Sequence, residues 1–163
     1  MNTPTTGHGA VTVFGVPGLP EIGQGAELAK LITGAAPSLL DGDIVVVTSK
    51  IISKAEGLVI EADREDAIAA ETVRVVARRG NTTISQTKHG FVMAAAGVDR
   101  SNTAPGTVVL LPADPDGSAR RLRAELAELT GITVRAVPLY MTDIVATTAM
   151  ARAAIELATE LRR

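Results

Sequence analysis

The chain has 163 residues, of which 46% are hydrophobic and 21% are charged, so it is long and apolar enough to form one domain with a substantial core. The formal net charge of −2, one Tyr, two Phe and no Trp argue against a nucleic-acid-binding protein, because bulk positive charge is absent and rings for base stacking are scarce. The lack of Cys excludes disulfides, thiolate metal sites and a Cys nucleophile, and two His are too few for a His-rich metal site.

The first residues, MNTPTTGHGA, lack the basic stretch of a secretory signal, and no apolar run approaches the about 20 residues of a membrane span. We therefore expect a cytoplasmic protein with no membrane partner. Residues 1–9 are polar and predict a flexible tail, and residues 10–163 are expected to form a single domain.

The first third of the chain predicts two strands and a helix. VTVFGV (11–16) has the β-branched and aromatic residues of a strand, and residues 26–39 have the apolar spacing of a helix. In DIVVVTSKIIS (43–53), four successive apolar residues, 44–47, indicate a strand that is buried on both faces.

The middle of the chain predicts a helix between strands. LVIEA (58–62) is typical of a short strand. Residues 65–79 are predicted as a helix, because apolar side chains share one face and arginines take the other. TTISQTKHGFVMAAAGV (82–98) predicts one or two strands, and TVVLLP (107–112) predicts another.

The last third predicts helix, strand and helix. Asp114 is expected to cap a helix that has Pro115 at its first position. The residues expected to be buried on that helix are Leu122, Leu126 and Leu129. ITVRAVPLY (132–140) predicts the last strand, and residues 143–162 predict a final helix with an apolar stripe. This order of elements predicts an α/β or α+β fold in which helices flank a mixed β-sheet.

Three segments carry residues suited to binding. GLPEIGQG (18–25) follows a predicted strand, and its backbone N–H groups can cradle an anion or a nucleotide, although it matches no standard nucleotide motif. The alternative is a tight connection between a strand and a helix.

The second segment is TSKIISK (48–54), at the end of the predicted buried strand. Its hydroxyl and ammonium groups can donate hydrogen bonds to phosphate oxygens, and active sites of open α/β sheets gather at strand ends. The alternative is a solvated exit from the sheet.

The third segment is AAAGVDRSN (94–102), in which small residues lead into polar ones. Asp99 offers the oxygen ligands that Mg²⁺ and Mn²⁺ prefer, and Asn102 can both donate and accept hydrogen bonds. The alternative is a turn in which Asp99 and Asn102 bond their own backbone.

These motifs together resemble a known family. GLPEI, DGDIVVVTSKIISKAEG, KHGFVMAAAGVDRSN and VVLLPADPDGSARRLRAELAELTG occur in this order, from about residue 11 to about residue 134. In its motifs and their spacing the chain is similar to the coenzyme F420-0:γ-glutamyl ligase family. The resemblance implies that the chain also has the fold of that family.

The resemblance implies an enzyme that uses GTP and Mg²⁺ or Mn²⁺ to add L-glutamate to coenzyme F420-0 through an acyl phosphate, and that works as a homodimer. It implies a GTP site made of Leu19, Pro20, Glu21, Ile22, Ser49, Lys54 and Asn102. It also implies that Asp99 is a metal ligand, and it makes Asp99 and Lys54 the candidate catalytic residues.

The chain departs from the family after the last predicted strand. The family continues into an Asp-Thr pair that binds metal, whereas here Met141, Thr142 and Asp143 follow the strand. Asp143 is therefore either the second metal ligand or the cap of the final helix. The chain is expected to be a shortened ligase, a regulatory or structural relative that binds GTP or metal without ligating, or a structural protein that keeps only the fold. We favour the ligase family and leave catalysis open.

Overall fold

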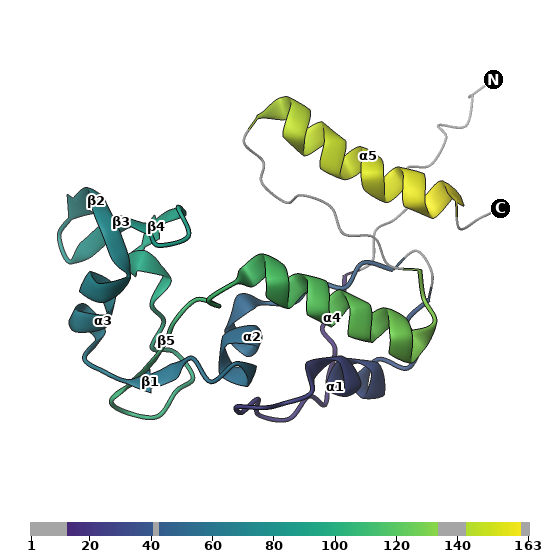
Figure 1. Ribbon diagram of the computed structural model, residues 1–163, viewed down its shortest axis with the longest axis horizontal. Coiled ribbons are helices and arrows are strands. Elements are labelled where there is room, and N and C mark those ends of the chain that lie inside the picture. Colours follow the sequence, from purple (N-terminus) through teal and green to yellow (C-terminus); the bar gives the residue numbers. More distant parts are fainter. Residues whose placement is uncertain (1–12, 41–42, 134–142, 161–163) are drawn as a thin grey trace, which may run out of the picture.

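The computed structural model describes residues 13–40, 43–133 and 143–160 (Figure 1). Within them the helices are α1 (Leu28–Ala35), α2 (Ser49–Ala55), α3 (Arg64–Glu71), α4 (Pro115–Thr130) and α5 (Ile144–Glu160), with a short 3₁₀ helix, η1 (Ala95–Gly97). The strands are β1 (Val59–Glu61), β2 (Thr72–Arg79), β3 (Thr82–Thr87), β4 (Val92–Ala94) and β5 (Thr107–Val109).

The strands form two small antiparallel sheets. β1 pairs with β5, and β3 lies between β2 and β4. In the first sheet Ile60 lies opposite Val108, and in the second Ile84 lies opposite Ala94. The α+β class predicted from the sequence is therefore confirmed, but the described strands pair in two antiparallel sheets and not in one mixed sheet.

A small apolar core lies where α3 and η1 meet β5. Its buried members are Ala67, Ile68, Ala96, Val98 and Val108. These side chains supply the hydrophobic free energy that holds η1 in place, and so they also fix where the chain leaves η1 towards residues 99–102.

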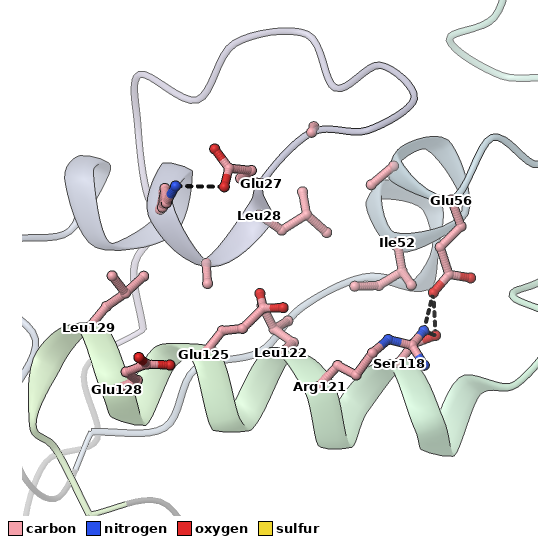
Figure 2. Close-up of a pocket in the computed structure, with 14 residues that line it drawn as sticks. Glu27, Leu28, Ile52, Glu56, Ser118, Arg121, Leu122, Glu125, Glu128 and Leu129 are labelled. Carbon is pink, nitrogen blue, oxygen red and sulfur yellow. Dashed lines mark hydrogen bonds and ion pairs between the residues drawn. The ribbon is translucent and has the colours of Figure 1, made fainter.

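A second group of contacts joins α1, α2 and α4. The Oγ of Ser118 donates a hydrogen bond to the Oε1 of Glu56, directly after α2, and the Nη2 of Arg121 donates to the same oxygen at 2.9 Å. Figure 2 shows Glu56 turned towards these two residues of α4. The three helices surround a pocket of about 530 Å³, and this contact ties the carboxyl end of α2 to α4.

Helix α5 lies apart from the other helices in Figure 1. The Oδ1 of Asp143 accepts a hydrogen bond from the N–H of Ala146 at 2.7 Å, so Asp143 caps the helix as one of its two sequence interpretations predicts. The apolar side chains of Ile144, Val145 and Ile155 are exposed. Among the described helices, none has both the length and the apolar character needed to cross a bilayer.

Several predicted elements are confirmed. The helix at 26–39 is α1, which is shorter than predicted, and the strands at 58–62 and 107–112 are β1 and β5. Residues 82–98 contain β3 and β4, and the Oδ1 of Asp114 accepts from the N–H of Gly117 to cap α4 as predicted.

The strand predicted from the apolar run at 44–47 is wrong. Residues 43–48 have no regular structure, α2 begins at Ser49, and Ile44 and Val46 are exposed. A strand needs a neighbour for its backbone N–H and C=O groups, and no described strand pairs with this segment. For the same reason residues 13–16 of the predicted first strand have no regular structure, while residues 11 and 12 lie outside the described part.

The predicted helix at 65–79 is correct only as far as α3. Residues 72–79 form β2, because three valines favour a strand and β3 supplies a partner along its length. On α4, Leu122 and Leu126 are half-buried and Leu129 is exposed, so none of the three is buried as predicted. Leu122 and Leu129 line the pocket between α1, α2 and α4. The predicted strand at 132–140 lies almost wholly outside the described residues.

Gly97 provides a test of how tightly η1 is packed. Its φ is +77°, and a Cβ there would lie 2.7 Å from a methyl carbon of Leu111. We expect Gly97→Ala to cost about 1–2 kcal/mol for the left-handed backbone and about 1–3 kcal/mol more for the clash, measured by urea unfolding. Gly106→Ala is the matched control, because its φ is +82° and a Cβ would meet nothing within 4 Å. Equal losses in the two variants would contradict close packing at Gly97.

Candidate functional site

Helix α2 carries two lysines towards one turn of the chain. Lys50 and Lys54 are four residues apart and therefore lie on the same face of the helix. The hydroxyl of Thr48 accepts a hydrogen bond from the N–H of Lys50 at 3.4 Å and caps the start of α2. Both lysines donate to residues 99–102, here called the 99–102 turn.

The ammonium of Lys50 is surrounded by oxygen atoms of this turn. Its Nζ lies 2.5 Å from the Oδ2 of Asp99 and 2.6 Å from the Oγ of Ser101. Two longer contacts of 3.5 Å reach the carbonyl oxygen of Ser101 and the Oδ1 of Asn102. These four atoms, called the oxygen cluster below, are a carboxylate, a hydroxyl, a carbonyl and an amide oxygen.

Lys54 joins the turn to the segment at 18–25. Its Nζ donates to the carbonyl oxygen of Asn102 at 2.9 Å and forms an ion pair with the Oε1 of Glu21. The side chain of Lys54 is only 9% exposed, whereas that of Glu21 is 81% exposed. Lys54 is therefore held in place, while its carboxylate partner remains accessible to solvent.

The 99–102 turn keeps its shape through its own hydrogen bonds. The backbone of Asp99 pairs with Val109 through N–H to O contacts of 3.0 and 2.7 Å. The Oδ1 of Asp99 accepts from the N–H of Ser101 at 2.8 Å, and the Oγ of Ser101 donates to the Oδ2 of Asp99 at 2.9 Å. Asp99 thus bonds nearby backbone in a turn, which is the alternative that the sequence offers to a metal-binding role. The turn leaves the oxygen cluster facing α2.

Three non-glycine residues around this turn have left-handed backbone. The φ angles are +52° at Ala95, +48° at Ala96 and +59° at Asn102. Such angles are uncommon for residues with a Cβ, although Asn tolerates them better than Ala. The small side chains of the AAAG run allow η1 to turn here and so to direct Asp99 towards Lys50.

The ion pair changes the acidity of Asp99. The hydrogen bond from the Lys50 ammonium lowers the pKa of the Asp99 carboxyl from 3.8 to about 2, with further help from Ser101. The side chains of Lys50 and Asp99 are 29% and 38% exposed, so water screens the pair. Ion pairs of this kind contribute only about 0–1 kcal/mol, and the contact can therefore be exchanged for another ligand.

An open pocket of about 440 Å³ adjoins Lys54. The residues that line it are Glu21, Lys54, Val59, Asn102, Thr103 and Ala104. It brings three of the predicted site residues to one surface, and a buried ammonium lies at its wall. An anionic group in this pocket would find Lys54 as its donor.

Four of the nine predicted site residues lie together where α2 meets the 99–102 turn. Glu21, Lys54, Asp99 and Asn102 are brought together by the contacts described above. Of the others, Ser49 is exposed at the first position of α2, Leu19 is half-buried, Pro20 is exposed and Ile22 is buried. Asp143 caps α5, and its role as a second metal ligand stays a prediction.

Lys50 and Ser101 also belong to the cluster. The sequence places Lys50 in a segment suited to phosphate and Ser101 in the polar stretch after the AAAG run, but neither is among the predicted site residues. The spacing of Lys50 and Lys54 by four positions is the signal that would have placed both on one face of a helix. The sequence predicts a strand at 44–47 that ends in this segment and predicts no helix there, so the spacing does not assign the two lysines to one helix face.

Acidic residues and histidines alone do not make a metal site in the described part of the chain. No group of three or more His, Cys, Asp or Glu suited to a metal ion occurs there. The oxygen cluster contains one carboxylate and three neutral oxygens, and a cation already occupies it in the form of the Lys50 ammonium. This donor set therefore fits a hard divalent cation only if Lys50 moves away.

Fold and cluster together define an α+β protein in which a lysine-bearing helix meets an oxygen-rich turn, an arrangement suited to phosphate groups and a hard cation. Residues 18–157 match the sequence model of the family described as F420-0:Gamma-glutamyl ligase. The chain belongs to this family, as its motifs predict.

Relatives named Coenzyme F420:L-glutamate ligase share more than a third of their aligned residues with this chain. The one from Methanothermobacter thermautotrophicus is 37% identical over 145 residues, which cover 74% of this chain and 58% of the relative. The one from Archaeoglobus fulgidus is 39% identical over 140 residues, with coverage of 74% and 56%. The one from Methanopyrus kandleri is 37% identical over 134 residues, with coverage of 70% and 53%. The chain thus spans a little more than half the length of these relatives.

The low pKa of Asp99 predicts how the Lys50 contact responds to acid. We expect Lys50→Met to raise the pKa of Asp99 towards 3.8, measured by NMR titration of the carboxyl carbon. Because the folded-state pKa lies below the unfolded one, the pair stabilises the fold above about pH 4, and this contribution is lost as the pH falls towards 2.

The control for this titration is Lys30→Met, since Lys30 pairs with Glu27 on α1 and should leave Asp99 unchanged. An Asp99 that still titrates near 2 in Lys50→Met would show that Lys50 is not the main cause of the shift.

Proposed function

We propose that this chain takes part in the ligation of L-glutamate to coenzyme F420-0, with GTP as the energy source and Mg²⁺ or Mn²⁺ as the metal. The observation that carries the proposal is the meeting of Lys50 and Lys54 with the 99–102 turn. Family membership and the names of the relatives support the substrates, and the charges of the cluster support phosphate and metal.

The two lysines are suited to hold the phosphates of GTP. Lys54 borders the pocket and is paired with Glu21, whose exposed carboxylate can move away when a phosphate takes its place. Lys50 lies one helical turn before Lys54 and is only partly buried. Two ammonium groups on one face of a short helix match the charge of a triphosphate, and each can donate a charge-assisted hydrogen bond.

The oxygen cluster is suited to the metal. Mg²⁺ in nucleotide sites commonly takes one or two carboxylates and completes its shell with phosphate oxygens and water. Asp99 would supply the carboxylate, and Ser101 and Asn102 would supply neutral oxygens. A metal bound there would screen the repulsion between the triphosphate and an incoming carboxylate.

The reaction that fits these groups has two steps. An oxygen of the acceptor carboxylate attacks the γ-phosphorus of GTP, the bond to the bridging oxygen breaks, and GDP leaves. The amine of L-glutamate then attacks the acyl carbon, phosphate leaves with the bonding electrons, and the nitrogen loses a proton to give the amide. The lysines act by holding phosphate oxygens in place, which favours in-line transfer.

A second candidate function is GTP and metal binding without ligation, in a regulatory or structural subunit. It is favoured by the single carboxylate of the oxygen cluster, together with the use of Asp143 as a helix cap. This form of the protein would bind GDP and Mn²⁺ but would leave coenzyme F420-0 unchanged.

The test of the proposed function is an assay for the product. Incubation with GTP, Mn²⁺, L-glutamate and coenzyme F420-0 is expected to give a glutamyl increment in the mass of the acceptor. We expect Lys54→Met to weaken GTP binding about tenfold or more, since a charge-assisted hydrogen bond is worth about 1.5–3 kcal/mol. Calorimetry measures the affinity.

Lys88→Met is the matched control for Lys54→Met, because Lys88 pairs with Glu71 beside the β2–β3–β4 sheet and should leave GTP binding unchanged. Unaltered affinity in Lys54→Met would remove this lysine from the site. GTP binding without any glutamyl increment would favour the second candidate function.

We also propose that the protein works as a homodimer with α5 near the interface. The exposed side chains of Ile144, Val145 and Ile155 form an apolar surface on that helix. Light scattering at micromolar concentration is expected to give twice the chain mass of 16.8 kDa. Ile155→Asp is expected to shift the protein to the monomer, whereas Glu156→Gln on the same helix is not. A wild-type monomer would contradict the proposal.

A further inference from the structure

The oxygen cluster holds a cation that belongs to the protein itself. Four oxygen atoms of the 99–102 turn lie 2.5–3.5 Å from the Nζ of Lys50. The donor types are those that a hard divalent cation prefers, and one of them is an ionised carboxylate. The ammonium thus stands where a metal ion would find its ligands.

We propose that Lys50 is an internal competitor for this cation site, and that a nucleotide opens the site by drawing the Lys50 ammonium to its phosphates. This inference rests on the proposed function, because it assumes that nucleotide and metal bind at this cluster. In the ligand-free protein Lys50 occupies the oxygen cluster, and it leaves the cluster when the metal enters.

Lys50 and a divalent cation cannot share the cluster. Both would lie within about 3 Å of the Oδ2 of Asp99, and like charges at such short separation repel strongly where water is partly excluded. The carboxylate can neutralise one of them. Metal binding in the absence of nucleotide must therefore release Lys50 into solvent and lose its contacts with Asp99 and Ser101.

Lys50 is the lysine that is free to move. Its side chain is 29% exposed, it lies in the first turn of α2, and its four-carbon stem has several accessible rotamers. Lys54 is 9% exposed and is fixed by Glu21 and by the carbonyl of Asn102. Exchange at the cluster therefore moves Lys50 while Lys54 stays in place.

The cluster does not need Lys50 to keep its shape. Asp99 is held by its backbone pairing with Val109 and by two hydrogen bonds from Ser101. A variant without the ammonium should keep the same oxygens in the same turn. Removal of Lys50 is therefore expected to strengthen metal binding, whereas loss of an ordinary structural lysine would weaken it or leave it unchanged.

The exchange makes nucleotide and metal bind cooperatively. A nucleotide that takes the Lys50 ammonium removes the competitor, and a metal that takes Asp99 frees the ammonium for the phosphates. By linkage, each ligand must raise the affinity for the other by the same factor, typically about 5–150-fold. This device would keep the protein from binding free metal and would favour the metal–nucleotide pair.

The experiment compares Mn²⁺ affinity, by electron paramagnetic resonance, with and without saturating GDP. In the wild type we expect GDP to strengthen Mn²⁺ binding within the about 5–150-fold range. In Lys50→Met, Mn²⁺ alone should bind about tenfold tighter than in the wild type, and the effect of GDP should shrink. Lys50→Arg keeps a cation in the cluster and should retain the wild-type coupling.

Two further variants complete the design. Lys88→Met, which removes an equal charge next to Glu71, should leave Mn²⁺ affinity unchanged, and Asp99→Asn should weaken it. If Lys50→Met binds Mn²⁺ alone no tighter than the wild type while GDP and Mn²⁺ still bind, the competition is overturned and the proposed function stands. If the wild type binds neither GDP nor Mn²⁺, both are overturned.

Discussion

The contacts between α2 and the 99–102 turn are the interaction on which the candidate site depends. They join positions that are about fifty residues apart in the chain, since Lys50 meets Ser101 and Lys54 meets Asn102. The carboxyl end of α2 is held separately, by Glu56 against Ser118 and Arg121 of α4. The α2 helix is thus anchored to the 99–102 turn along the face that carries both lysines, and to α4 through Glu56 at its carboxyl end.

The charges of the two α2 lysines are balanced by carboxylates before any ligand binds. Lys50 is matched by Asp99, and Lys54 is matched by Glu21. A phosphate or a metal ion that enters such a site must exchange with a charge that is already there, and the affinity is the difference between the new contact and the old one. Partial exposure keeps the old contacts weak, because water already screens them. This balance explains how the same residues can hold the turn in shape and still give way to ligands.

The sequence identifies most of the chemistry of the site but not its geometry. Asp99, Asn102, Lys54 and Glu21 were recognised from motifs, and the caps at Asp114 and Asp143 follow from local hydrogen bonding that the sequence encodes. The apolar run at 44–47 was read as a strand, yet strand formation depends on a partner elsewhere in the chain, which no local pattern reveals. Because the sequence predicts no helix at 49–55, it does not predict that Lys50 and Lys54 share one face. Residues 72–79 show the opposite error: their side-chain pattern predicts a helix, but they form a strand because β3 supplies a pairing partner.

The central claim is that the oxygen cluster of the 99–102 turn is a cation site occupied by Lys50 until nucleotide and metal bind. The most direct measurement is an anomalous difference map from crystals grown with Mn²⁺ and GDP. We expect a manganese peak within coordination distance of the Oδ2 of Asp99, with the Nζ of Lys50 moved to a phosphate oxygen. A manganese peak elsewhere, with the ion pair between Lys50 and Asp99 intact, would contradict the claim.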